Sequence, residues 1–355
     1  MLKLPYGIGK RNNQIPETHW ENLGSSYQIT KPTIICLGGN GTRGSEQANH
    51  VCKIAEGLIG LKDKTIENEW PTSEDVDIIG ISYGEEYAVS SFGKKVTNRS
   101  AHLTIKEQQQ IFYQLFTPLI SNNGQKLSDE DLLKNMSLLT FFSFCQGAHE
   151  TKAFVTKLEQ HMLLQGYSMS LCEQALNQIV SVSYAPMTTV PYVKRFDVKS
   201  LEDKYFSYGY EYERDTGFFE YTLRGNHLAF DNPNERFPFE NGMTLYSSQL
   251  ADSYPLLNEH NLSVIERSLS NWKLEAISPD GPIYMGENAD KASQCMGYVL
   301  ATSVVCGLNN QLNSSYTPKP EISTLFDDCN AILFPEQNPH ALKLTPISEQ
   351  EDFSK

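Results

Sequence analysis

The sequence lacks several features that would each indicate a particular class of protein. Its 355 residues contain no CxxC pair and seven cysteines, an odd number that cannot all pair within one chain. We therefore expect no disulfide scaffold and a reducing compartment. Nowhere do about 18 apolar residues follow one another, and the first residues lack the apolar run of a secretory signal. The sequence therefore predicts no transmembrane segment and a cytoplasmic location.

Clustered basic residues are also missing. The formal net charge is −14, with 29 Lys and Arg residues against 43 Asp and Glu residues. Proteins that bind nucleic acid neutralise phosphates with clustered Lys and Arg, so this composition argues against a nucleic-acid partner. No group of His and Cys residues has the spacing of a metal site, and we expect neither a metal nor an organic cofactor.

What the sequence does contain is an alternation of short apolar runs and amphipathic segments. Short runs rich in β-branched and aromatic residues predict buried strands, and apolar residues at helical spacing predict helices between them. This alternation is typical of an α/β fold with a mostly parallel, doubly wound sheet, whose functional residues lie at the carboxyl ends of the strands. The predicted strands are 32–37, 76–83, 138–144, 179–184, 282–285 and 331–334, and the predicted helices are 46–61, 105–120, 292–308 and one that directly follows Gly147.

Changes in composition along the chain predict its domain organisation. Residues 1–30 carry turn formers and form an N-terminal extension packed on the core, which comprises 31–190 and 273–345. The aromatic, turn-rich segment 191–272 is predicted to be an inserted lid or cap. Residues 346–355 form an acidic C-terminal tail. The tail resembles the acidic C-terminal signals of proteins that intracellular bacteria inject by type IV secretion, which would imply an effector acting in a host cytosol.

A nucleophilic side chain is predicted where the third strand meets its helix. Ser143–Gly147 reads SFCQG and resembles the GxSxG nucleophile elbow of the α/β hydrolases. Gly147 keeps the second small position, Ser143 replaces the first glycine, and Cys145 stands where that family usually has serine. A helix N-terminus stabilises a thiolate, and dienelactone-hydrolase-like members of the family use cysteine. The alternative is a buried structural cysteine at the end of a strand.

A glycine-rich loop follows the first predicted strand. CLGGNG at Cys36–Gly41 resembles the HGGG-type oxyanion loop of the same family. The resemblance implies that backbone N–H groups around Gly38, Gly39 and Asn40, with that of Gln146, bind the negative oxygen of a tetrahedral intermediate. A phosphate-binding loop is the alternative, but GGNGTRG lacks both the GxGxxG spacing and the GK[ST] ending.

The resemblance also implies where the remaining catalytic partners lie, because hydrolases of this family carry nucleophile, acid and histidine in that order. PIYMGENAD at 282–290 implies Asp290 as the orienting acid, and AILFPEQNPHAL at 331–342 implies His340 as the general base. Other candidates stay open: Glu287, Asp280 and Asp252 for the acid, His227 and His260 for the base, and His149, four residues after Cys145, as a contact of the thiolate.

Together these features predict a cysteine-dependent hydrolase or acyltransferase that acts on an ester, thioester or amide through an acyl-enzyme. Its partner would be a small-molecule or acylated substrate. The alternative is a catalytically inactive scaffold or effector of the same fold, which binds a protein partner through the predicted lid.

Overall fold

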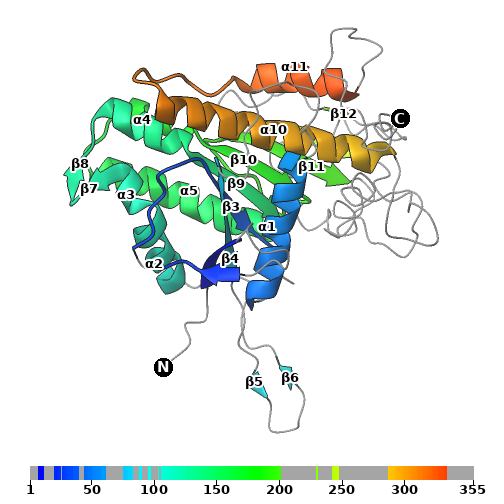
Figure 1. The fold of residues 1–355 in the computed structure, drawn as a ribbon, viewed down its shortest axis with the longest axis horizontal. Coiled ribbons are helices and arrows are strands. Elements are labelled where there is room, and N and C mark those ends of the chain that lie inside the picture. The colour runs from blue at the N-terminus through cyan, green and yellow to red at the C-terminus, as the bar shows by residue number, and fades with distance from the viewer. Residues whose placement is uncertain are drawn as a thin grey trace, which may run out of the picture.

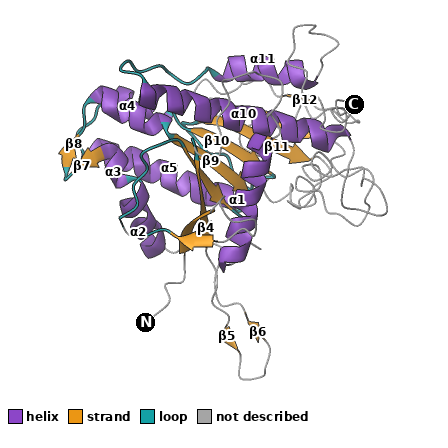
Figure 2. Cartoon of the chain, viewed as in Figure 1, coloured by secondary structure: helices purple, strands orange, loops and turns teal. Residues whose placement is uncertain are grey.

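The core of the protein is one large β-sheet with helices packed on both faces (Figure 1, Figure 2). The structure is a computed structural model. It describes residues 7–11, 20–24, 26–39, 44–60, 75–82, 88–89, 95–96, 103, 105–200, 229–230, 242–247 and 287–333.

Within the described residues the main sheet has nine strands, and the six in its centre run parallel. Its edges are antiparallel, since β1 pairs with β4, β2 with β1 and β12 with β13. The predicted α/β class is confirmed. In spatial order the strands are β12 (Ala229–Phe230), β13 (Gly242–Ser247), β11 (Lys194–Ser200), β10 (Val180–Tyr184), β9 (Leu139–Phe144), β3 (Thr33–Leu37), β4 (Asp77–Ser82), β1 (Gly7–Arg11) and β2 (Trp20–Asn22).

Helices connect most of the parallel strands, as parallel pairing requires. Two short hairpins lie apart from the main sheet: β5 (Ala88–Val89) with β6 (Lys95–Val96), and β7 (Ser121–Asn122) with β8 (Gln125–Lys126). The helices of the described part of the chain are α1 (Gly44–Gly60), α2 (Ile105–Leu115), α3 (Thr117–Ile120), α4 (Asp129–Ser137), α5 (Gly147–Leu164), α6 (Met169–Leu176), α10 (Glu287–Leu312) and α11 (Ile322–Leu333).

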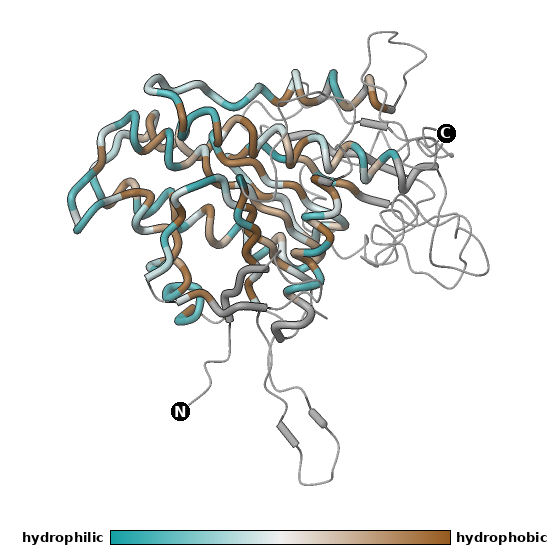
Figure 3. The backbone as a smooth tube through the Cα atoms, in the orientation of Figure 1, coloured by the Kyte–Doolittle hydropathy of each residue, from teal (hydrophilic) through white to brown (hydrophobic). Residues whose placement is uncertain are grey.

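Each face of the sheet has its own hydrophobic core. Side chains alternate along a strand, so Phe142 of β9 packs with α1, α10 and α11, while Phe141 packs with the helices α2 to α6 on the other face. Both phenylalanines are fully buried. Figure 3 shows hydrophobic residues concentrated along the central strands. Burial on both faces explains why these strands are recognisable as continuous apolar runs.

Most of the predicted elements in the first half of the chain are confirmed within a residue or two. One predicted helix, 105–120, is instead two, because α2 ends at Leu115 and α3 begins at Thr117. Pro118 explains the break, since proline has no N–H to donate to the carbonyl one turn earlier. The N-terminal extension contributes the edge strands β1 and β2.

The predicted division of the chain into a core and an inserted lid at 191–272 is wrong, because the core sheet extends into this segment. Lys194–Ser200 forms β11 and pairs in parallel with β10, and Gly242–Ser247 forms β13 beside it. Both strands belong to the core sheet. The charged residues of β11 hid it from sequence patterns, because Lys194, Arg195 and Asp197 are buried in spite of their charge. Apart from 229–230, the rest of the insertion lies outside the described residues, as does the predicted strand 282–285.

The predicted strand at 331–334 is also wrong. Residues 331–333 are the last turn of α11. Leu325, Cys329 and Ile332 are buried at helical spacing, so this segment covers the core with one side of a helix. A run of four apolar residues cannot by itself distinguish a strand from a helix. Residue 334 lies outside the described part of the chain.

Candidate functional site

Cys145 occupies a tight turn between β9 and α5. Its backbone φ is +53°, in the left-handed region that costs a non-glycine residue about 1–2 kcal/mol. Three backbone hydrogen bonds hold the turn. The Cys145 N–H donates to the Tyr184 carbonyl at 3.1 Å, and the Cys145 carbonyl accepts from Ala148 N–H at 3.3 Å and Met187 N–H at 3.2 Å. The end of β10 therefore fixes the position of this turn.

Two glycines allow the loop after β3 to lie directly against this turn. A Cβ atom on Gly147 would come within 2.2 Å of the Leu37 carbonyl oxygen, and one on Gly39 within 2.9 Å of the Cys145 Cβ. Real Cβ atoms are not found at such distances from other heavy atoms, so neither position accepts a larger residue without movement. The glycine pair after β3 and the SFCQG turn thus form one packed unit.

The sheet register brings these parts of the predicted site together. In the parallel pair of β3 and β9, Leu37 lies opposite Ser143, so both strands end at the same edge. Gly38 and Gly39 follow β3 at that edge and are buried. Cys145 is partly exposed, unlike the buried Cys36 of β3. Four predicted residues, Gly38, Gly39, Cys145 and Gln146, therefore lie within one small region.

The side chain of Ser143, at the first small position of the turn, contacts its neighbour on the adjacent strand. Its hydroxyl lies 2.8 Å from that of Ser183 on β10, and both serines are fully buried. Asp197 of β11 lies opposite Ser183 in the register and forms an ion pair with Arg195. A buried polar row therefore crosses three strands just below the edge that carries Cys145. The alternating serines of VSVSY in β10 are the feature of the sequence that could have indicated this polar row.

A buried carboxylate in the first turn of α5 was missed by sequence reasoning. Glu150 is 1% exposed. It accepts hydrogen bonds from the Leu103 N–H at 3.2 Å and from the Gln108 Nε2 at 3.0 Å. These contacts fix the start of α2 against the helix that follows Cys145. His149 lies beside Glu150 in the same turn and is partly exposed.

The described surroundings of Cys145 are largely apolar. The ring of Phe144 stacks on Tyr184 with centroids 6.0 Å apart and planes at 16°. Phe144 is partly exposed, and a Cβ on Gly39 would also come within 3.1 Å of its ring. Met187, whose N–H holds the Cys145 carbonyl, is partly exposed as well. The residues before Cys145 in the chain and at the end of β10 therefore contribute aromatic side chains near this turn.

The acid and base predicted from the sequence are not brought to Cys145 by the described structure. Asp290 lies in the first turn of α10, where only its backbone is described. Ser303 of α10 bonds Thr140 near the start of β9, and Gly307 packs on Ser137 before that strand. Helix α10 therefore runs antiparallel to β9, and its first turn points toward the edge where β9 ends. His340, Asn40, Asp252, Asp280, His227 and His260 lie outside the described residues.

Comparison with known proteins adds no family to this description. No protein-family model matches the chain, and no curated protein is significantly similar to it in sequence. Within the described ranges, no group of three His, Cys, Asp or Glu residues is arranged to hold a metal ion. In the same part of the chain, no helix combines the length and apolarity needed to cross a bilayer.

Proposed function

We propose that the protein is a cysteine-dependent hydrolase or acyltransferase of the α/β-hydrolase type, acting on an ester, thioester or amide. The observation that carries the proposal is the partly exposed Cys145 at φ +53°, packed against Gly39 at the carboxyl edge of a parallel sheet. The Cys145 thiolate attacks the substrate carbonyl and expels the alcohol, thiol or amine. Water or a second acceptor then takes the acyl group from sulfur.

The turn geometry supports this proposal because it brings together backbone groups that can act as hydrogen-bond donors to an oxyanion. In this type of site, the backbone N–H after the nucleophile and those of a neighbouring glycine loop bind the developing negative charge. Gln146 begins a helix directly after Cys145, and Gly38 and Gly39 lie at the same edge. The Asn40 N–H is proposed as a further donor. Such donors lower the activation barrier most when they are held in place before the substrate binds. The close packing of Gly39 and Gly147 holds this loop in that way.

The described topology changes which histidine we propose as the base. His340 was expected because the last strand seemed to precede it, but residues 322–333 are helix α11. Among the described elements the last parallel strand is β13, and the next histidine along the chain is His260. By the order of nucleophile, acid and histidine, we propose His260 ahead of His340 as general base. Glu202 and Asp203, the first carboxylates after β11, then precede Asp290 as candidates for the acid.

The proposal is tested by measuring how fast each cysteine of the full chain reacts with iodoacetamide at neutral pH, using mass spectrometry of the labelled peptides. Cys306 is the internal control, because it is also partly exposed. Burial raises the pKa of the Cys306 thiol, which keeps it protonated. We expect Cys145 to react at least about tenfold faster than Cys306. Equal rates would contradict a nucleophilic Cys145.

Substitution of the histidines then separates the candidates for the base. His260→Ala should slow both the labelling of Cys145 and the hydrolysis of p-nitrophenyl acetate by about a hundredfold, the usual size of a general-base contribution. His340→Ala and His227→Ala serve as matched controls and should leave both rates within about threefold of wild type. Loss of activity in His340→Ala alone would restore the original assignment.

A second candidate is an inactive scaffold of the same fold that binds a protein partner. Helix α11 in place of the predicted last strand favours it, because the expected support of His340 is absent from the described residues. Slow labelling of Cys145, together with hydrolysis that is unchanged in Cys145→Ala, would support this candidate instead.

A further inference from the structure

An open cavity lies on the surface far from Cys145. Its volume is about 640 Å³, and it lies between the first turns of α4 and α6 and the segment that joins α10 to α11. We call that segment, residues 313–321, the strap. Helix α5 begins two residues after Cys145 and ends at Leu164, just before α6. Its 18 residues span about 27 Å, so the cavity and the thiol lie near opposite ends of this helix.

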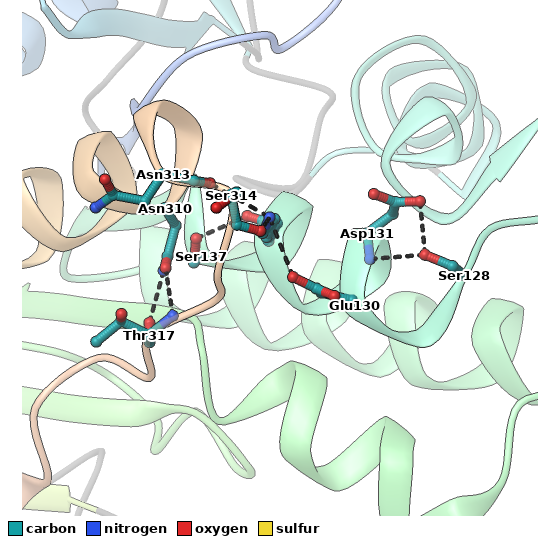
Figure 4. Close-up of polar contacts among 9 residues, drawn as sticks. Ser128, Glu130, Asp131, Ser137, Asn310, Asn313, Ser314 and Thr317 are labelled. Carbon is teal, nitrogen blue, oxygen red and sulfur yellow. Dashed lines mark hydrogen bonds and ion pairs between the residues drawn. The ribbon is translucent and has the colours of Figure 1, made fainter.

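The strap is held in place by side chains of the neighbouring helices (Figure 4). The ammonium group of Lys134 on α4 donates to the Ser314 carbonyl at 2.6 Å and to the Asn313 carbonyl at 3.4 Å. Asn310 of α10 makes two bonds of 2.7 Å with the backbone of Thr317, one as donor and one as acceptor. The wall of the cavity that the strap forms is therefore fixed without a ligand.

The other two walls are helix starts that are capped by serine. The Ser128 hydroxyl accepts from the Asp131 N–H at 3.1 Å and donates to the Asp131 carboxylate at 2.6 Å (Figure 4). The Ser168 hydroxyl accepts from the Leu171 N–H at 3.2 Å. Each cap satisfies an N–H that the helix leaves without a partner. The backbone around this open hollow is therefore ordered before a ligand binds, which lowers the cost of binding.

The charges around this cavity balance. Its two carboxylates are Asp129 and Glu130, on the first turn of α4. Asp129 pairs with Lys126 at 3.6 Å, and Glu130 pairs with Lys134 at 3.2 Å. A cationic ligand would have to compete with the lysines, and an anionic one would meet the carboxylates. The charge pattern therefore favours a ligand without net charge.

The remaining lining offers hydrogen-bonding groups of both kinds beside apolar surface. Ser168, Ser170 and Gln174 of α6 present hydroxyls and an amide, and the Gln174 amide already lies 3.3 Å from the Ser170 hydroxyl. Tyr316 of the strap adds a flat ring and a phenol. Burial, with a contribution from the charge of Glu321, raises the pKa of Tyr316, which stays a neutral donor at physiological pH.

We propose that this cavity binds a neutral, hydroxyl-rich ligand of the class of short carbohydrates. The carboxylates of Asp129 and Glu130 accept from ligand hydroxyls, and the hydroxyl and amide groups of α6 donate and accept. The Tyr316 ring offers an apolar face of the kind that packs on a sugar ring. The binding site is independent of the chemistry proposed at Cys145.

The test is saturation-transfer NMR of the full chain with maltose, cellobiose and lactose. We expect at least one of these disaccharides to bind with a Kd of about 1 mM or tighter. Ser170→Trp, which fills the cavity, should weaken that binding at least about tenfold. Ser26→Trp is the matched control, because Ser26 is an exposed serine that does not line the cavity, and its affinity should stay within about threefold of wild type.

A second variant keeps the test decisive if Ser170→Trp fails to fold. Gln174 is exposed, so Gln174→Ala should fold normally and should weaken binding about threefold or more through loss of its amide. Absence of binding by all three sugars would overturn the proposal. So would sugar binding that neither Ser170→Trp nor Gln174→Ala weakens, or tighter binding of spermidine that Ser170→Trp abolishes.

Discussion

Replacement of Gly147 by alanine should disrupt the turn that carries Cys145. The new Cβ atom would lie 2.2 Å from the Leu37 oxygen, 2.7 Å from the Leu37 carbonyl carbon and 3.0 Å from the Gly38 oxygen. All three are backbone atoms of β3 and its loop, which no side-chain rotation can move. Relief to ordinary contact requires a shift of about 1 Å between β3 and the start of α5, in a core packed as densely as a crystal.

The free-energy cost follows from this geometry. Overpacking of a core by one methyl group typically costs about 1–3 kcal/mol, and here the obstacle is backbone in the centre of the sheet. We expect Gly147→Ala to lower the free energy of unfolding by about 3 kcal/mol or more, and the Tm by roughly 6 °C or more. Urea denaturation and calorimetry measure these quantities. Labelling of Cys145 should slow in the same variant, because the loop at Gly38 and Gly39 must move.

Gly24 provides a matched control. A Cβ atom there would meet nothing closer than a Ser26 oxygen at 3.8 Å, and Gly24 does not have the positive φ that favours glycine. Gly24→Ala should therefore leave the stability within about 1 kcal/mol of wild type, and the lower entropy of its unfolded chain favours a small gain. If Gly147→Ala matched Gly24→Ala in stability, the close packing of the SFCQG turn against β3 would be refuted.

Two further predictions concern buried ionisable side chains. Burial lowers the pKa of Lys319 to about 7 from 10.5, so between these pH values the unfolded chain binds more protons and stability rises with pH. In urea denaturation, wild type should therefore gain about 2 kcal/mol relative to Lys319→Met between pH 7 and pH 9, and a constant difference would contradict a neutral buried lysine. Glu150→Ala should cost about 1–3 kcal/mol, because the Leu103 N–H and the Gln108 amide lose their acceptor. Glu150→Gln, which keeps a carbonyl oxygen, should cost less, and an equal loss in both variants would refute this role for the hydrogen bonds.

The apolar strands could be predicted from the sequence because their environment is uniform. TIICL of β3 and LTFFSF of β9 are buried on both faces by helices, so nearly every position is apolar or small. The turn at Cys145 was predictable for a related reason. A tight strand-to-helix turn needs small residues, and Gly147 at the end of SFCQG is such a residue, so the sequence indicates the turn.

Strand β11 could not be predicted because its buried charges are satisfied by residues distant in sequence. Lys194 donates to the Lys319 carbonyl at 2.8 Å across 125 positions of the chain. Arg195 and Asp197 pair with each other, yet a pair two residues apart looks the same on an exposed strand. The pattern of apolar and polar residues in a segment predicts only its average burial. A buried charged side chain whose hydrogen-bond partner lies far away in the sequence therefore cannot be recognised from its neighbours. The error in β11 then carried over to the predicted bounds of the lid.

The backbone of Cys145 supplies the strongest argument that its side chain matters. Glycine would adopt φ +53° at no steric cost, whereas any side chain there costs about 1–2 kcal/mol. Strain alone does not prove a function, because Ala185 at the end of β10 has φ +47° and carries no reactive group. The two residues differ in exposure: Ala185 is 5% exposed and its methyl group fills the core, while Cys145 is partly exposed at the carboxyl edge. Packing accounts for a strained side chain in the first case but not in the second, where the reactive thiol that we propose would account for it.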